Sequence, residues 1–219
     1  MSFANEAARL ISDFWNLQDS IIIKYNYRDL SDETVREELE RILRKELSLF
    51  AKKFVTKDFK LVVPADKVVA IGRKGFVDSM LANYFAYNLQ GQFHLLGNLT
   101  HEHVCDNEIA LQGSMWVLGR SWTGIPPVIN ATTITTQLTS HTDYVVRKEC
   151  DELKLSFINT DFRSLQVFGP VADFNPAPVL NRPLNPSIKC LPEGYALFDG
   201  CRLNPDHYPR PRLDPTIPQ

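Results

Sequence analysis

Residues 143–168 constrain the fold of this chain more than any other stretch, because their apolar side chains recur at every second position. Leu153, Leu155 and Phe157 alternate with polar residues, and after a slip the pattern resumes at Phe162. The charged segment 149–152 precedes this run and follows another apolar one. Such alternation is typical of a half-buried antiparallel hairpin, with one face in solvent and one face packed. The stretch therefore predicts two paired strands joined by a charged turn.

An earlier segment, residues 93–98, places two polar side chains on one face of another strand. His94 and Asn98 are four residues apart, and strand side chains with this spacing point to the same side. On the concave side of a curved sheet, the pair would bring polar groups into an apolar pocket. The segment therefore supplies the first candidates for a functional site.

The remaining elements give an α+β order, with helices before strands. Apolar spacing predicts helices over residues 4–26, 32–54 and 72–87, the second with Ser31 as its N-cap. Strands are predicted over residues 59–63, 93–104, 109–118 and 144–147, with a turn at Lys57–Asp58. Residues 119–141 contain Pro126–Pro127 and many threonines, and they predict a loop or irregular hairpin long enough to form a lid.

The last fifty residues differ from the rest in composition. Of the 14 prolines, 11 lie in residues 170–219, and so dense a proline content disfavours regular helix or sheet. Tyr195, Phe198 and Tyr208 in this segment favour an ordered extension that packs on the domain or on a partner subunit, and a disordered tail is the alternative. We therefore expect one domain over residues 1–169 and a proline-rich C-terminal extension over residues 170–219.

Composition and motifs exclude several classes of function. The formal charge of -2 argues against a nucleic-acid partner. No apolar run approaches the roughly 20 residues that cross a bilayer, and no leader pattern is present, so we expect a cytoplasmic protein without a membrane partner. The four scattered cysteines are expected to be reduced thiols, with Cys190 and Cys201 the one pair to check for a bridge. Neither a phosphate-binding glycine loop nor a dinucleotide fingerprint occurs, so no cofactor is expected.

The order and spacing of four blocks resemble a known family. The blocks are LQDSIIIKYNYRDLSD, FVTKDFKLVVP, FHLLGNLTHEHVCDNEIALQGSMWVL and TDYVVRKECDELKLSFINTDFRSL. They look like the SnoaL-like, scytalone dehydratase-like branch of the nuclear-transport-factor-2-like (cystatin-like cone) superfamily. The resemblance implies an α+β cone, in which a curved antiparallel sheet and three N-terminal helices enclose an apolar pocket. It also implies a homodimer or higher homo-oligomer.

The resemblance further implies a set of site residues. Tyr27 and Asp32 match the tyrosine and aspartate that follow the first helix in the dehydratases, His94 matches the strand histidine, and Arg163 matches an arginine of the last strand. Asp32 also begins the second helix, where it would serve as a cap, so Asp29 is a rival for the acidic role. No metal ligand is implied, and His101, His103 and Cys105 are better interpreted as an exposed strand edge.

These residue types suit the elimination of water. His94 can remove a C–H proton or protonate a leaving hydroxyl, and a carboxylate from Asp32 or Asp29 would orient it. Tyr25 or Tyr27 could donate to a carbonyl as negative charge develops, and Arg163 could anchor the substrate.

Two further residues complete the substrate-binding set. Asn98 could orient the substrate, and one of Met115 and Trp116 should line the pocket, so we include Trp116. Each candidate also has a plain structural interpretation: pocket lining for His94, packing for Tyr27, and an exposed strand position for Arg163.

The sequence thus predicts a cofactor-independent dehydratase, isomerase or cyclase that acts on a hydrophobic small molecule of the polyketide, terpenoid or steroid-like type, as in secondary-metabolite biosynthesis. One alternative is a non-catalytic binding or dimerisation module with the same fold. Another is the small subunit of a ring-hydroxylating dioxygenase. A pocket with convergent polar groups would favour the enzyme, whereas a cone filled with apolar side chains would favour the module.

Overall fold

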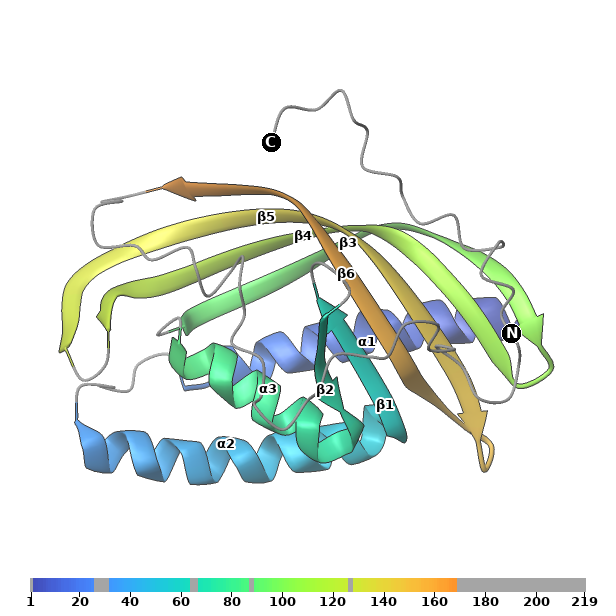
Figure 1. Ribbon diagram of the computed structural model, residues 1–219, viewed down its shortest axis with the longest axis horizontal. Coiled ribbons are helices and arrows are strands. Elements are labelled where there is room, and N and C mark those ends of the chain that lie inside the picture. Colours follow the sequence, from blue (N-terminus) through green and yellow to red (C-terminus); the bar gives the residue numbers. More distant parts are fainter. Residues whose placement is uncertain (1, 26–31, 64–66, 87–88, 126–127, 169–219) are drawn as a thin grey trace.

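The computed structural model describes residues 2–25, 32–63, 67–86, 89–125 and 128–168 (Figure 1). Within these ranges the chain forms three helices and six strands. In chain order the elements are α1 (Phe3–Ile23), α2 (Glu33–Phe54), β1 (Val55–Val63), β2 (Lys67–Ile71), α3 (Gly72–Ala86), β3 (Leu89–Cys105), β4 (Glu108–Ile125), β5 (Val128–Glu149) and β6 (Glu152–Phe168). The predicted extension, residues 170–219, lies outside the described residues.

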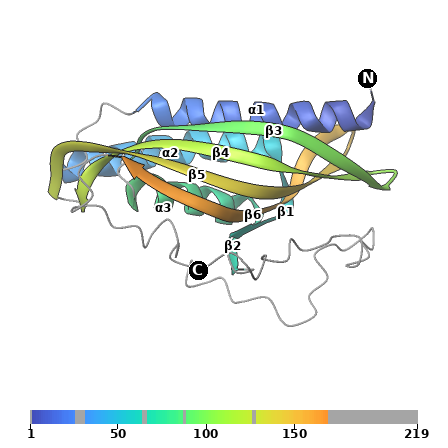
Figure 2. The same ribbon diagram turned by 90° about the horizontal axis from the view of Figure 1, so that it is seen from above.

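The six strands form one curved sheet in the order β2-β1-β6-β5-β4-β3, with the helices on its concave side (Figures 1 and 2). Neighbouring strands are antiparallel except β1 and β6, which are parallel. Helix α1 packs along β3, and α3 packs on β1 and β2. The predicted α+β cone is confirmed, although the sheet is mixed and not wholly antiparallel.

The helices form where the sequence places an apolar stripe. In α1 the buried positions recur three or four residues apart, at Ala7, Ile11, Phe14, Trp15, Gln18, Asp19 and Ile22. Helix α2 begins after Asp32, whose side chain accepts hydrogen bonds from the backbone of Thr34 (2.8 Å) and Val35 (3.3 Å). The N-cap of α2 is therefore Asp32, whereas the sequence had suggested Ser31, which lies outside the described residues.

Of the two alternatives predicted for residues 119–141, a loop or an irregular hairpin, the structure has the hairpin. Residues 119–125 and 128–141 are strand, as the ends of β4 and β5, and their pairing has a register shift between Trp122 and Gly124. The lid loop does not form in these residues, and the turn predicted at Lys57–Asp58 is also wrong. Threonine is β-branched and favours strands, and this preference prevails over the irregular apolar pattern. Lys57 and Asp58 likewise lie within β1. The turn between β5 and β6 is confirmed, with Cys150 (φ 49°) and Asp151 (φ 67°) as its two left-handed residues.

Aromatic rings fill the space between the helices and the sheet. The ring of Phe14 lies 5.1 Å from that of Phe50, 6.0 Å from that of Phe54 and 5.8 Å from that of Phe76. Phe59 of β1 packs edge-on against Phe76 at 5.6 Å. Burial of one such side chain stabilises the fold by about 1.5–3 kcal/mol. The rings thus fix the helical layer against the sheet.

Two further findings concern the described residues as a whole. No helix among them is long and apolar enough to cross a membrane. Cys105 is disulfide-bonded, contrary to the expectation of reduced thiols, and Cys150 is free and exposed. The other two cysteines lie outside the described residues.

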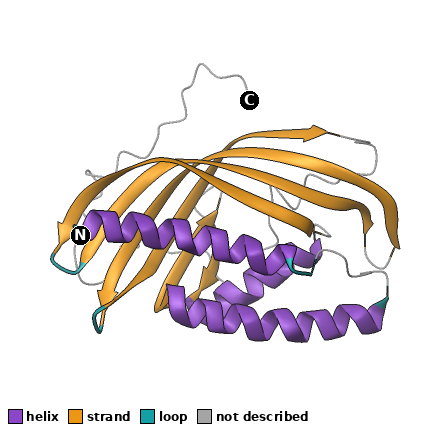
Figure 3. Cartoon of the chain, turned by 180° about the vertical axis from the view of Figure 1, so that it is seen from behind, coloured by secondary structure: helices purple, strands orange, loops and turns teal. Residues whose placement is uncertain are grey.

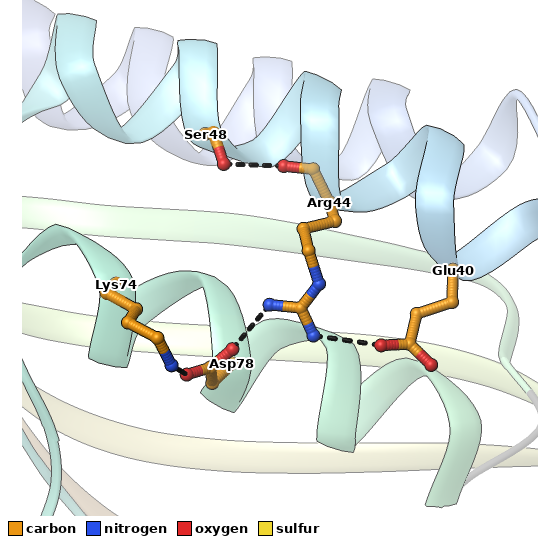
Figure 4. Close-up of polar contacts among 5 residues, drawn as sticks. All are labelled: Glu40, Arg44, Ser48, Lys74 and Asp78. Carbon is orange, nitrogen blue, oxygen red and sulfur yellow. Dashed lines mark hydrogen bonds and ion pairs between the residues drawn. The ribbon is translucent and has the colours of Figure 1, made fainter.

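A network of ion pairs joins α2 to α3 (Figure 4). Arg44 donates to Asp78 through Nη1 (2.6 Å) and to Glu40 through Nη2 (2.8 Å), and Lys74 donates to Asp78 Oδ2 (2.6 Å). Ser48 Oγ donates to the carbonyl of Arg44 (2.6 Å), one turn earlier. Burial raises the pKa of Asp78, but the hydrogen bonds from Lys74 and Arg44 outweigh it, so the pKa of this carboxyl is lowered.

This network predicts a pH-dependent stability. A carboxylate whose pKa is lowered by folding stabilises the protein above its unfolded pKa, and the effect is lost as the pH falls through the folded pKa. Asp78→Asn should therefore cost about 1 kcal/mol at pH 7 and progressively less below about pH 4. Urea unfolding at several pH values measures the difference in the free energy of unfolding between this variant and the unmodified protein. Glu37→Gln, at an exposed position of α2, is the control. A loss of unfolding free energy in Asp78→Asn that persists in strong acid would contradict the prediction.

A second polar cluster joins three strands of the sheet, β1, β4 and β5. Arg147 of β5 donates through Nε to Glu108 of β4 and through Nη1 to Asp58 of β1 (2.8 Å). The side chain of Glu108 is 4% exposed, and no described residue hydrogen-bonds its Oε2. The guanidinium of Arg147 is thus the cation that offsets a buried carboxylate.

Removal of this cation should be costly. Arg147→Met should destabilise the protein by about 3–5 kcal/mol, because Glu108 would remain buried without a positive partner. The double variant Arg147→Met, Glu108→Gln should recover most of that loss in chemical unfolding. Equal stability of the single and double variants would show that the carboxylate is not held by Arg147.

Candidate functional site

The site centres on a buried pair formed by His94 of β3 and Asp19 of α1. Nδ1 of His94 lies 2.7 Å from Oδ1 of Asp19, and the backbone N–H of His94 donates to Oδ2 at 2.7 Å. The two side chains are 4% and 7% exposed. Both carboxylate oxygens are therefore engaged by one residue, and solvent hardly reaches the pair.

The local fold brings these residues together. His94 lies opposite Val117 on the inner face of the sheet, where α1 packs along β3. Asp19 is four residues after Trp15 and three before Ile22, and both are buried on the same stripe of α1. One polar residue of a helical stripe thus meets one polar residue of a strand face.

The contact with Asp19 favours one tautomer of His94. A carboxylate accepts hydrogen bonds, so Nδ1 is the donor to Asp19, and in a neutral imidazole Nε2 then carries a lone pair. Nε2 lies 3.1 Å from the amide nitrogen of Gln92, which can donate to it. Gln92 is half-buried and two residues before His94, hence on the same face of β3. Nε2 is the basic atom of the site, and Gln92 covers it.

Two aromatic residues complete the surroundings. The indole of Trp15 stacks on the imidazole of His94, with ring centroids 4.0 Å apart and an interplanar angle of 22°. Its Nε1–H donates to the hydroxyl of Tyr144 (3.1 Å), which lies 3.8 Å from the sulfur of Met115. Burial raises the pKa of Tyr144 well above its ordinary value, so the phenol stays neutral. Trp15 thus shields one face of the imidazole and fixes its plane.

The predicted residues near the start of α2 that the structure describes make other contacts. Asp32 is exposed and caps α2. Tyr25 donates its hydroxyl to Glu46 (2.8 Å). Tyr27 and Asp29 lie outside the described residues.

The three predicted strand residues also lie elsewhere. Arg163 is exposed and pairs with Asp161 (2.9 Å). Trp116 is 43% exposed and lies opposite Leu95 on the outer face of the sheet, while Met115 faces the interior. Asn98 is exposed, and a register shift between Leu96 and Leu99 interrupts the alternation that would have aligned it with His94. Of the members of the predicted set that the structure describes, His94 alone lies at the centre of the site.

The structure adds Asp19, Gln92, Trp15 and Tyr144, which the sequence analysis did not consider. Asp19 carried a usable signal, because it is an acidic residue on the apolar stripe of α1. A buried carboxylate requires a partner, and such a residue is a site candidate for that reason. Among the described residues, no group of three or more His, Cys, Asp and Glu side chains could hold a metal ion.

The comparisons with known proteins identify the fold. No protein-family model matches the sequence, and no curated protein matches it. A candidate scytalone dehydratase from Novosphingobium aromaticivorans DSM 12444 superimposes with a TM-score of 0.51 and 14% identity, over 78% of this chain and 88% of the other. A hexachlorocyclohexane dehydrochlorinase, LinA type 2, gives a TM-score of 0.52 and 13% identity, over 79% of this chain and 96% of the other. The chain therefore has the same fold as these two proteins, an α+β cone with a curved sheet, and this is the fold that the resemblance in its sequence predicted.

Proposed function

We propose that this protein is a cofactor-independent lyase or isomerase in which His94 acts as the general base on a hydrophobic small molecule. The observation that carries the proposal is the buried Asp19–His94 pair, in which Nδ1 contacts the carboxylate and Nε2 is left as the atom that can act as a base, in a site shielded from solvent. In this proposal Asp19 takes the orienting role that the sequence analysis gave to Asp32 or Asp29. The names of the two superimposed structures, a dehydratase and a dehydrochlorinase, support an elimination as the reaction class.

The proposed steps follow from the hydrogen bonds. Nε2 takes a proton from a carbon next to a carbonyl, and the carboxylate of Asp19 stabilises the imidazolium that forms. The electron pair of the broken C–H bond forms a double bond as the neighbouring C–O bond breaks. The imidazolium then gives its proton to the departing hydroxyl, and water leaves. Return of the proton to another carbon would instead give isomerisation.

Gln92 must move for this chemistry to occur. Its amide lies 3.1 Å from Nε2, at the position that a substrate C–H would occupy. Rotation of the side chain would uncover the lone pair and leave the amide free to bind a carbonyl or hydroxyl of the substrate. Val117 of β4 lies opposite His94, and Leu138 of β5 lies opposite Val117. These apolar side chains favour a hydrophobic substrate, for which we propose a polyketide, terpenoid or steroid-like molecule. Tyr27 and Asp29 remain predicted partners of that substrate.

We also propose a homodimer that forms through the outer face of the sheet. Three neighbouring apolar side chains on that face are strongly exposed: Phe93 (55%), Leu95 (52%) and Trp116 (43%). Exposed apolar clusters of this kind mark protein contacts. In this proposal Trp116 serves assembly and not substrate binding.

The catalytic proposal predicts a loss of turnover when either member of the pair is replaced. His94→Gln should lower turnover by about 10²–10⁴-fold, because no base remains. Asp19→Asn should lower kcat by about 10²-fold or more, because the tautomer of His94 is no longer enforced. The assay follows conjugated enone absorbance from a panel of hydrophobic β-hydroxy ketones.

The chain provides a matched control for this experiment. His141 pairs with Asp143 (Nε2 to Oδ1, 3.5 Å) on the outer face of the sheet, so His141→Gln removes a similar histidine–aspartate pair away from the site. It should leave turnover unchanged. Turnover by His94→Gln equal to that of the unmodified protein would exclude the proposed mechanism.

A second candidate function, a non-catalytic binding module, is favoured by one observation. The helical side of the cone is filled by aromatic rings, among them Phe14, Phe50, Phe54 and Phe76. Such filling is what an adaptor would show. If none of the panel is turned over while the protein still binds one of these ketones or a protein partner, and His94→Gln does not alter that binding, the module is the better description.

A further inference from the structure

A groove of about 760 Å³ lies between helix ends and the start of β6, and it shares no residue with the site around His94. Its walls come from four elements that meet at one end of the molecule: the first half of α1, the last turn of α2, the first turn of α3 and the start of β6 (Figure 3). This volume lies in the range of small-molecule sites, about 300–1,000 Å³. The groove therefore has the dimensions of a ligand site.

Part of the groove is apolar. Leu10 of α1, Leu49 and Phe54 of α2 and Leu153 of β6 contribute to its lining. Leu49 is 64% exposed, because it lies off the stripe with which α2 packs on the core. Exposed apolar surface in a concave position is a feature of binding sites.

The charged residues of the lining are predominantly basic. Arg9, Lys52, Lys53, Arg73 and Lys154 face three acidic residues, Glu6, Asp13 and Glu152. Two of the basic residues have acidic partners within the groove: Lys154 lies 2.9 Å from Glu152, and Arg9 lies 3.9 Å from Asp13. Lys52 and Lys53 have no such partner among the described residues. Arg73 makes no ion pair there either, although its charge adds to the effect of Lys154 in lowering the pKa of Glu152.

Lys52, Lys53 and Arg73 make no ion pair with any residue that the structure describes. Nε of Arg73 donates to the backbone carbonyl of Val55 (3.0 Å), which fixes the guanidinium and leaves its other nitrogens available. The ammonium of Lys53 lies 5.0 Å from the ring centroid of Phe54. These cations thus stand beside the apolar lining.

We propose that this groove binds a small amphiphilic anion, namely an elongated apolar molecule that ends in a carboxylate. The apolar body would lie on Leu10, Leu49 and Leu153, and the carboxylate would pair with Arg73 or with Lys52 and Lys53. Charge complementarity and a volume suited to a small molecule favour this ligand over a protein segment. The site is separate from His94 and does not depend on the catalytic proposal.

Isothermal titration calorimetry of the full chain with decanoate, below its micelle concentration, tests the proposal. Decanoate should bind with a stoichiometry of one, whereas decanol and acetate should each bind at least about tenfold more weakly, because one lacks the charge and the other the chain. Binding should weaken as salt is raised. A groove that bound decanol as well as decanoate would contradict the role of the cations.

Surface variants locate the binding. Leu49→Asp, at an exposed position that the fold does not need, should weaken decanoate binding about tenfold or more, and the double variant Lys52→Gln, Lys53→Gln should weaken it similarly. Lys45→Gln, an exposed cation of α2 outside the groove, should have no effect.

Two results would overturn the proposal. One is decanoate binding that is absent, or unchanged in both Leu49→Asp and the double lysine variant. The other is selective binding of an acidic amphipathic peptide, lost in Leu49→Asp, by a chain that does not bind decanoate. That result would assign the groove to a protein partner.

Discussion

The hydrogen bonds between Asp19 and His94 are the interaction on which the site and much of the helix–sheet arrangement depend. Burial of a carboxylate is costly unless both of its oxygens are satisfied. His94 meets this requirement alone, with its backbone N–H and its Nδ1. Because one partner is on α1 and the other on β3, the same contacts hold the helix in register with the strand. The plane of the imidazole and the stacking of Trp15 follow from that register.

The sequence predicts those parts of the fold that depend on local periodicity. Helices α1 and α2 and the hairpin after residue 143 have strong 3.6-residue or two-residue patterns, and each forms close to where it was expected. Helix α3 also forms where it was expected, although its apolar periodicity is weak. For residues 119–141 a loop and an irregular hairpin were both left open, because Pro126–Pro127 and the many threonines are compatible with either. The hairpin forms, as the end of a β4–β5 pair that extends well beyond this segment.

The site was harder to predict than the fold. His94 was identified, but its partner was sought after the first helix, at Asp29 and Asp32, and not within it. Asp32 satisfies backbone donors of α2 instead, which is the usual role of an aspartate before a helix. The face of Trp116 depends on whether odd or even residues of β4 point inward, and this choice is set by tertiary packing. Asn98 was misplaced by a bulge, which sequence patterns rarely reveal.

The strand that carries His94 presents different chemistry on its two sides. Phe93 and Leu95 flank His94 in the sequence, and their side chains point to the outer face of the sheet. A second subunit bound to that face would therefore contact the strand whose backbone positions the imidazole. Self-association and the ordering of the reactive centre would then be thermodynamically linked through three consecutive residues. In such an arrangement dissociation of the dimer on dilution would make the position of the His94 imidazole less well ordered. A substitution on either face of this strand would then affect the other face.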